Sequence, residues 1–214
     1  MLLGELGCYP VSLEAKSRIL CFWYKLLLDF DSGSNKLSVL MLRLCSELYA
    51  NTDHELQWLV CVKSLLDSLG LSFVWEGRCQ WSLPQFKAII KQRLKDQFIQ
   101  SWHQSINEKD ICLNYRIFKQ SFGLETYLLK LSTRLCKPLL KFRLSLHKLP
   151  IQSLRYLGIA RHNRLCTLCN NNELGDEFHF LFNCTHQQIV DARKSYIYLH
   201  ISRGIQTPLK CVLL

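Results

Sequence analysis

Cys166-Thr-Leu-Cys169, followed by His179 and Cys184, forms the pattern C-x2-C-x9-H-x4-C. Three thiols and one imidazole are a ligand set that zinc takes in tetrahedral structural sites. The four residues between His179 and Cys184 make about one helical turn plus one residue, so both side chains can face the same way. The stretch therefore predicts a small CCHC zinc knuckle with Cys166, Cys169, His179 and Cys184 as ligands and Zn2+ as the cofactor.

The residues between these ligands fit a compact knuckle. The chain must reverse just after the second Cys, where Asn170 and Asn171 stand, and Asn is the non-glycine residue best suited to a left-handed backbone. His186 is a spare imidazole, but His179 is better placed in the pattern. An apolar cover over the site is expected from Phe178, Phe180, Leu181 and Phe182.

Two other interpretations of these cysteines remain open. The chain has eleven cysteines, so some C-x-x-C pairs arise by chance, and free Cys is often only a small buried apolar residue. A C-x-x-C pair can also be a redox motif, although such a motif needs no downstream His and Cys. Ligand type and spacing favour zinc, and four protein ligands leave no position for a substrate, so we expect a structural site.

The composition is that of an ordinary globular protein. Of the 214 residues, 49% are hydrophobic and 21% are charged, unlike a disordered chain. An odd number of scattered cysteines without a secretory signal indicates a reducing intracellular compartment, the nucleus or the cytoplasm. No uncharged apolar run approaches the length of a membrane span, so no transmembrane segment is expected.

Apolar residues recur at helical spacing along most of the chain, and no alternating run is long enough to predict a sheet. We therefore expect an all-α fold, a bundle-like array of helices followed by the small C-terminal zinc knuckle. A helix over 124–147 could divide at Pro138, because Pro inside a helix costs about 3 kcal/mol. The other predicted helices span 12–28, 36–50, 52–70, 82–106 and 113–122, after an irregular lead-in over 1–11. The expected regions are N-terminal helices over 1–81, basic helices over 82–160, the knuckle over 161–190 and a tail over 191–214.

Positive charge is concentrated in one part of the chain. The formal net charge is +10, and residues 84–165 contain sixteen Lys and Arg against four acids. Such a segregated basic region predicts binding to the phosphates of RNA or DNA, although a solvated helix face is the alternative. Lys130, Arg134, Lys137 and Lys141 would project from one face of a continuous helix. The predicted phosphate contacts are Lys130, Arg134, Lys137, Lys141, Arg143, Arg161 and Arg164.

Several motifs resemble the C-terminal end of LINE-type non-LTR retrotransposon polyproteins. In that family, a stretch like R-x-x-x-H-x-L-x-I-E-x-G-R-Y precedes a C-x2-C…H-x4-C knuckle with D-E-[FY]-H-F before its last Cys. The similar segments here are Arg143-Leu-Ser-Leu-His147-Lys-Leu-Pro-Ile151, Arg155-Tyr156, Cys166-Thr-Leu-Cys169 and Gly175-Asp-Glu-Phe-His179-Phe-Leu-Phe-Asn-Cys184. Looser similarity extends to Gly4-Glu-Leu-Gly-Cys-Tyr-Pro10. Gln152, Ser153 and Leu154 stand where the family has its Glu and Gly.

This resemblance implies that the chain corresponds to the segment that follows a reverse-transcriptase core. A reverse-transcriptase core is therefore an expected partner. The polymerase itself needs clustered carboxylates to hold two metal ions. No Y-x-D-D-like pair and no nuclease constellation occurs in the sequence. The chain is therefore expected to be non-catalytic.

Two classes of function follow from the sequence. The first is a zinc-stabilised module that binds template RNA or target DNA through phosphate contacts. The second is a structural module that docks on a polymerase or another protein, in which zinc only closes a small fold.

The last residues, Cys211-Val-Leu-Leu214, match a C-a-a-X box for prenylation of Cys211. A chance ending is the favoured interpretation, because only Arg203 and Lys210 supply positive charge nearby.

Overall fold

The chain forms two compact units that divide within one helix. The computed structural model describes residues 1–51, 57–109, 112 and 114–202. Unit 1 comprises Met1–Cys8 and His103–Leu214, and unit 2 comprises Tyr9–Trp102. The sequence instead predicts regions that divide after residues 81, 160 and 190. One source of the difference is that the first eight residues group with the second half of the chain.

The described residues are mostly helical, which confirms the predicted all-α class. Their only β pairing consists of two isolated bridges, Leu6 with Leu124 and Leu165 with Leu174. None of the described helices has the length and hydropathy that a membrane crossing requires.

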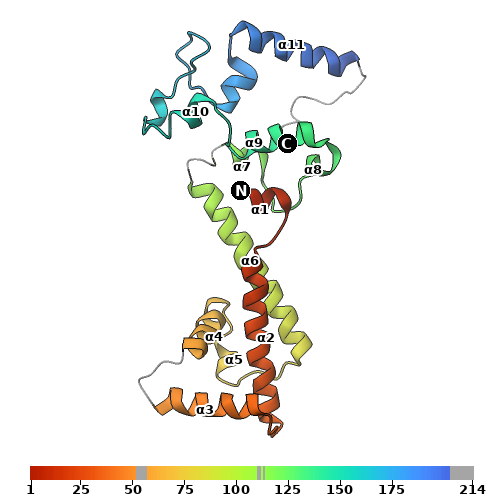
Figure 1. Ribbon diagram of the computed structural model, residues 1–214, viewed down its shortest axis with the longest axis vertical. Helices are drawn as coiled ribbons and strands as arrows, with labels where there is room; N and C mark the ends of the chain where they lie inside the picture. The colour runs from red at the N-terminus through yellow and green to blue at the C-terminus, as the bar shows by residue number, and fades with distance from the viewer. Residues whose placement is uncertain (52–56, 110–111, 113, 203–214) are drawn as a thin grey trace. The chain divides into compact units, whose positions relative to one another are not determined.

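Unit 2 contains the helices that the sequence predicts best (Figure 1). They are α2 (Val11–Asp31), α3 (Leu37–Asn51), α4 (Gln57–Ser68), α5 (Ser72–Trp75) and α6 (Leu83–Glu108), which continues past the unit boundary. The predicted start of the third helix near residue 52 lies outside the described residues. Gly70, where this helix was predicted to stop, has a φ of 67°, a left-handed conformation that ends a helix with little strain.

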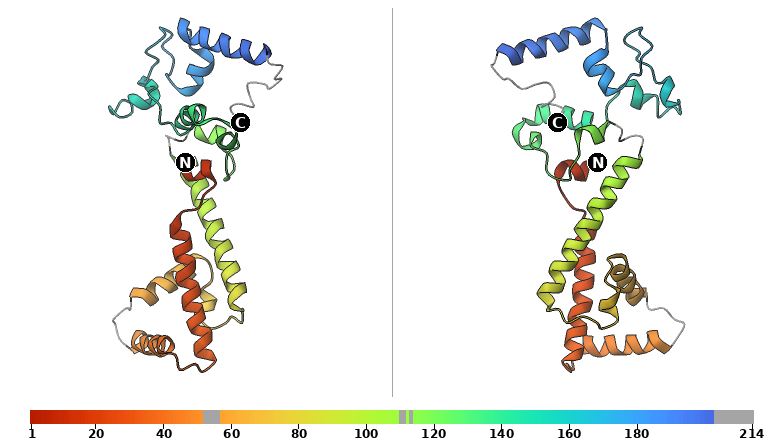
Figure 2. Two further views of the ribbon diagram at one scale, coloured as in Figure 1. Left: turned by 45° about the vertical axis from the view of Figure 1, so that its right-hand side comes forward. Right: turned by 180° about the vertical axis from the view of Figure 1, so that it is seen from behind.

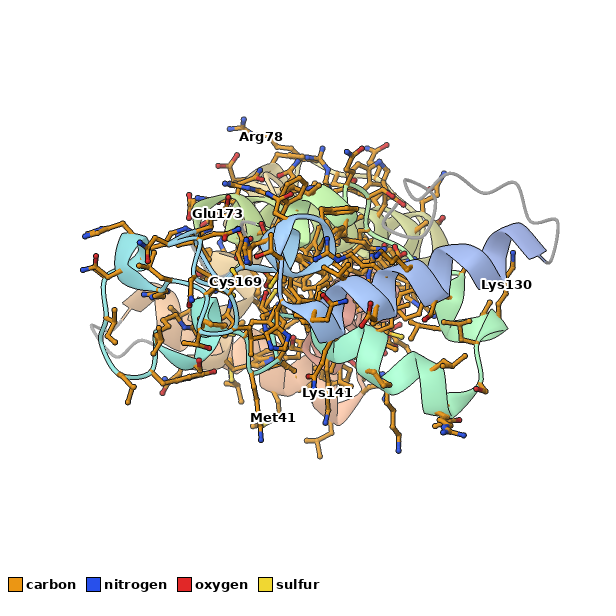
Figure 3. The ribbon with its side chains drawn as sticks, turned by 90° about the horizontal axis from the view of Figure 1, so that it is seen from above. Met41, Arg78, Lys130, Lys141, Cys169 and Glu173 are labelled. Atoms are coloured by element: carbon orange, nitrogen blue, oxygen red, sulfur yellow. The ribbon has the colours of Figure 1, made fainter. Side chains whose placement is uncertain are left out.

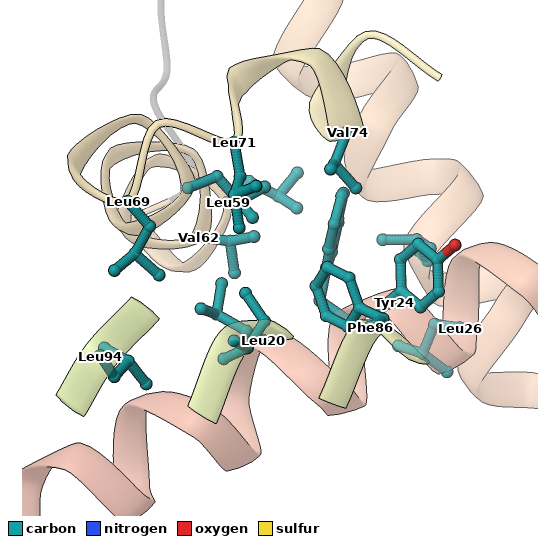
Figure 4. Close-up of a cluster of buried hydrophobic side chains, with 14 of the residues drawn as sticks. Leu20, Tyr24, Leu26, Leu59, Val62, Leu69, Leu71, Val74, Phe86 and Leu94 are labelled. Carbon is teal, nitrogen blue, oxygen red and sulfur yellow. The ribbon is translucent and has the colours of Figure 1, made fainter. Parts of the chain in front are cut away.

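The core of unit 2 forms where α2, α4, α5 and α6 bring their apolar faces together (Figure 4). The rings of Tyr24 and Phe86 stack with centroids 4.0 Å apart. The Tyr24 hydroxyl donates a hydrogen bond to the Trp81 carbonyl (2.7 Å), so this buried polar group is satisfied. Burial and the nearby Cys79 thiol raise the pKa of Tyr24 to about 12. Other side chains that are almost fully buried include Leu20, Leu59, Val62, Leu66, Leu71, Val74 and Ile90.

Unit 1 is built mostly from short helices, with α11 as its longest (Figure 2). They are α1 (Leu2–Leu6), α7 (Tyr115–Phe118), α8 (Tyr127–Lys130), α9 (Thr133–Arg143), α10 (Pro150–Ser153), η2 (Arg161–Asn163), η3 (His179–Asn183) and α11 (Gln187–Ser202). The prediction of an irregular lead-in over 1–11 is wrong, because α1 and the first residue of α2 lie there.

The predicted helix over 124–147 divides at a different place from Pro138. The break lies at Leu131 and Ser132, and Pro138 stays inside α9. Leu131 and Ser132 both have extended backbone conformations, which end α8 and begin α9. Lys130 is therefore on a different helix from the other residues of its predicted stripe.

A buried ion pair ties α1 to the end of α9. Glu5 is fully buried, and its two carboxylate oxygens lie 3.1 Å from Nη2 and Nε of Arg143. The Tyr127 hydroxyl donates a further hydrogen bond to Glu5 (2.6 Å). Arg143 also pairs with Glu125 (3.2 Å), and Glu125 pairs with buried Lys119. The two carboxylates and the two basic side chains thus neutralise one another in the interior of unit 1.

Backbone contacts fix the same junction. The Glu125 amide donates to the Glu5 carbonyl (3.0 Å), beside the bridge between Leu6 and Leu124. Gly7 has a φ of 61°, and a Cβ placed there would lie 2.4 Å from the Leu124 nitrogen. Only glycine permits this close approach of the two segments.

We expect Arg143→Ala to lower the free energy of unfolding of unit 1 by about 3–5 kcal/mol, because it leaves the Glu5 carboxylate buried and unpaired. The measurement is urea unfolding followed by circular dichroism. Arg134→Ala, on the same helix but exposed, is the control and should change stability by no more than about 0.5 kcal/mol. Equal effects of the two substitutions would contradict a structural role for the buried pair.

Candidate metal centre

The predicted knuckle begins with a tight chain reversal. The Cys166 amide donates to the Glu173 carbonyl (2.8 Å), and the Gly175 amide donates to the Arg164 carbonyl (2.9 Å). A Cβ at Gly175 would lie 2.8 Å from the Pro150 ring and 3.1 Å from the Cys166 Cα. The absence of a side chain at Gly175 therefore lets the reversal pack against α10.

A single π-helical turn, η3, places the second pair of predicted ligands. The Cys184 amide donates to the His179 carbonyl (2.7 Å), five residues earlier. This wider turn puts both side chains on the same side, which the spacing of one helical turn plus one residue predicts. The Asp176 carboxylate accepts from the His179 amide (2.8 Å) and caps the start of the turn.

The four predicted ligands converge and could hold a metal ion. Their ligand atoms all lie within 4.8 Å of one another. Sγ of Cys169 is 3.3 Å from Nε2 of His179, and the Sγ atoms of Cys166 and Cys184 are 4.0 Å apart. A tetrahedral site with thiolate and imidazole ligands has edges of about 3.4–3.8 Å, so the spacing fits one ion at the centre.

The surroundings favour thiolate at one of these cysteines. The Asn171 amide donates to Cys169, and with nearby thiols and the His179 ring it lowers the pKa of Cys169 to about 6. Burial raises the pKa of the Cys184 thiol. Thiolate is the form that binds a metal, so Cys169 is prepared for the ion at neutral pH.

Glu173 orients the ring of His179. Its Oε2 lies 2.7 Å from Nδ1 of His179, while Nε2 faces the Cys169 sulfur. A carboxylate on Nδ1 holds the proton there and leaves Nε2 free to bind a metal. Sequence reasoning missed Glu173; its position between the ligand pairs is the only signal that could have suggested it.

Two details of the predicted knuckle differ from the structure. The left-handed residue of the reversal is Asn172 (φ 52°), not Asn170 or Asn171. Of the four residues predicted to cover the site, Phe180 packs against the buried cysteines, whereas Phe178 is 60% exposed. Spare His186 does not belong to the ligand cluster.

α11 supplies two contacts that the sequence did not indicate. Ile189 packs against Cys169 and Cys184. Arg193 donates hydrogen bonds to the carbonyls of Phe182 and Cys184, which end the π-helical turn. The predicted tail thus takes part in the knuckle.

A second buried carboxylate joins the knuckle to the segment after α9. Glu177 accepts hydrogen bonds from Asn114 and from the Ser145 hydroxyl (3.4 Å), and its Oε1 lies 2.6 Å from Nε2 of His147. Burial alone would raise the pKa of Glu177, but the hydrogen bonds from His147 and Asn114 outweigh it and lower the pKa. The charged form of Glu177 therefore holds α7, residues 145–147 and the knuckle together.

The predicted phosphate contacts divide into exposed and structural residues. Lys130, Arg134, Lys137 and Lys141 are exposed, on α8 and α9, and none forms an ion pair with another described residue. Figure 3 labels Lys130 and Lys141 of this set.

The arginines among these predicted contacts are mostly engaged inside the unit. The prediction for Arg143 is wrong, because its guanidinium is buried against Glu5. Arg164 donates to the carbonyls of Ile159 (2.8 Å) and Ile151 (3.1 Å), so much of its donor capacity is used within the fold. Arg161 is half-buried in η2. Cys211 lies outside the described residues.

No family model, no curated protein and no solved structure matches the chain.

We expect the protein purified under reducing conditions to carry one metal ion per chain, measured by elemental mass spectrometry. Cys166→Ser or His179→Ala should release the ion and unfold residues 160–190 while the unit 2 helices persist, which hydrogen exchange can follow. Cys136→Ser and His186→Ala, outside the cluster, are matched controls that should keep the ion. Wild-type protein without metal would contradict the site.

We expect Glu173→Gln to weaken metal binding about 10–100-fold, because the carboxylate that orients His179 is lost. Competition with a chromophoric chelator measures the affinity. Glu76→Gln, at an exposed acid of unit 2, should leave it unchanged. An unaltered affinity in Glu173→Gln would mean that this contact does not position the ligand.

Proposed function

We propose that the chain is a non-catalytic, zinc-stabilised module that binds single-stranded nucleic acid. The observation that carries the proposal is an exposed cationic surface in the same unit as the ligand cluster. Arg134, Lys137 and Lys141 have the helical spacing of one face of α9, and all three are exposed.

Zinc is the ion that best suits the ligand set. Three thiolates and one imidazole in tetrahedral spacing are typical of structural zinc sites, and hard cations such as Mg2+ prefer oxygen ligands. All four positions would be filled by protein, so the ion would stabilise the knuckle and take no part in a reaction.

The cations suit a phosphate backbone. Lys130 on α8 precedes the α9 cations, and none of these four side chains is neutralised by a carboxylate among the described residues. Free cations can each neutralise a phosphate and release a counterion, which gives affinity without sequence specificity.

Exposed aromatic rings favour a single strand over a duplex. Tyr156 is 74% exposed, and the Arg155 guanidinium lies 5.0 Å from its ring centre. Phe178, beside the ligand His179, is 60% exposed. Unpaired bases can stack on such rings, whereas the bases of a duplex are already stacked on one another.

The resemblance to the C-terminal segment of LINE-type polyproteins agrees with this function. A module of that kind would hold template RNA or target DNA for a reverse-transcriptase core.

A second candidate is a module that docks on a protein, with zinc purely structural. The observation in its favour is the apolar exposure of α8 and α9. Leu129 is 73% exposed and Leu135 is 59% exposed, close in sequence to the cations. A polymerase or another protein could cover these side chains.

The test is binding to a fluorescent single-stranded oligonucleotide across a salt series. We expect steep salt dependence, and the triple variant Arg134→Gln, Lys137→Gln and Lys141→Gln should reduce the slope of log affinity against log salt by about two, at about 0.7 for each lost contact. The matched control replaces three exposed unit 2 cations, Lys25, Lys63 and Arg78, with Gln. Absent or salt-insensitive binding would favour the docking module.

A further inference from the structure

We propose that the outer face of α3 is a homodimer interface, at which two copies of this chain pair their α3 helices antiparallel. Among its described side chains, α3 exposes four large apolar ones: Leu37 (76%), Leu40 (42%), Met41 (53%) and Leu44 (55%). Their spacing of i, i+3, i+4 and i+7 places them in one stripe along the helix. We refer to these four residues as the α3 stripe.

The α3 stripe belongs to a helix whose opposite face packs in the unit 2 core. The opposite face of α3 contributes Val39 (3% exposed) and Leu42 (6% exposed) to the unit 2 core, and Cys45 packs against that core. α3 lies at the edge of its unit (Figures 1 and 2), and the four side chains of the stripe are exposed. Single exposed apolar residues are normal, but a stripe at this spacing is typical of helices that pair.

The α3 stripe is complementary to itself when a second copy runs in the opposite direction. A two-fold axis through the middle of the stripe sets Leu37 against Leu44 of the second copy and Leu40 against its Met41. Each side chain then meets another of similar volume, and both copies use the same surface. A closed two-fold dimer requires this self-complementarity.

The charges at the two ends of the stripe select the antiparallel direction. Lys36 precedes α3 and Glu47 lies near its end, and each side chain is 62% exposed. Antiparallel pairing brings Glu47 close to the start of the α3 of the second copy, where both Lys36 and the helix dipole favour an acid. Parallel pairing would instead set Lys36 against Lys36 and Glu47 against Glu47.

Lys36 and Glu47 each form a surface ion pair within unit 2 that a contact with a second copy could replace. Lys36 lies 3.1 Å from Asp29, and Glu47 lies 3.8 Å from Arg43, at the surface of the same unit. Surface pairs of this kind contribute little to stability, so they can adjust to a second copy at small cost. Because four side chains bury little area, the dimer belongs to the class of small interfaces, below about 1,200 Å² in total, that bind weakly.

Sedimentation equilibrium of the full chain, free of nucleic acid and under reducing conditions, tests the proposal. We expect a reversible monomer–dimer equilibrium that shifts with protein concentration. Met41→Glu should weaken it about tenfold or more, because a charge enters the apolar stripe. Leu129→Glu, at an exposed Leu of unit 1, is the matched control and should leave it unchanged. Circular dichroism of each variant checks that it remains helical.

Charge reversal tests the direction of pairing. Lys36→Glu and Glu47→Lys should each weaken the dimer, and the double variant should restore it, because both ends then carry reversed but complementary charges. The dimer should also survive a metal chelator, because the ligand cluster lies in unit 1. Monomers at every concentration, equal effects of Met41→Glu and Leu129→Glu, or no rescue in the double variant would each overturn the proposal.

Discussion

The buried pairing of Glu5 with Arg143 is the constraint on which the arrangement of unit 1 depends. A carboxylate without exposure to solvent must find a cation, and the only cation it contacts among the described residues stands 138 residues later in the chain. Satisfying that demand draws α1 onto the end of α9. Lys119 and Glu125 complete the charge balance, and Tyr127 supplies a further donor. The first eight residues therefore belong to the second half of the chain.

Carboxylates also pair with basic side chains around the cluster of cysteines and His179. Glu177 joins His147 to the knuckle, and Glu173 holds the ring of His179. Arg143, His147 and His179 each meet a carboxylate in the structure, those of Glu5, Glu177 and Glu173. These three basic side chains thus hold separate segments of unit 1 together.

These ion pairs leave other cations of unit 1 exposed. Arg143 stands in a basic run of sequence but serves as an internal tie, whereas Lys137 and Lys141 on the same helix remain free of carboxylates among the described residues. The positive charge of this part of the chain therefore separates into buried structural cations and exposed cations without a carboxylate partner. Sequence counts of charge cannot make this separation, because they do not record which cation is buried.

The sequence by itself determined the features that depend on nearby residues. The convergence of Cys166, Cys169, His179 and Cys184 follows from spacing, because one reversal and one helical turn can bring them together. The long helices α2 and α6 follow from apolar periodicity over many turns. Tertiary structure alone decided that Arg143 is internal, that Glu173 holds the histidine and that the units divide at Trp102. Each of these depends on a partner or a packing arrangement distant in sequence, and local patterns carry no information about what a side chain meets after the chain has folded.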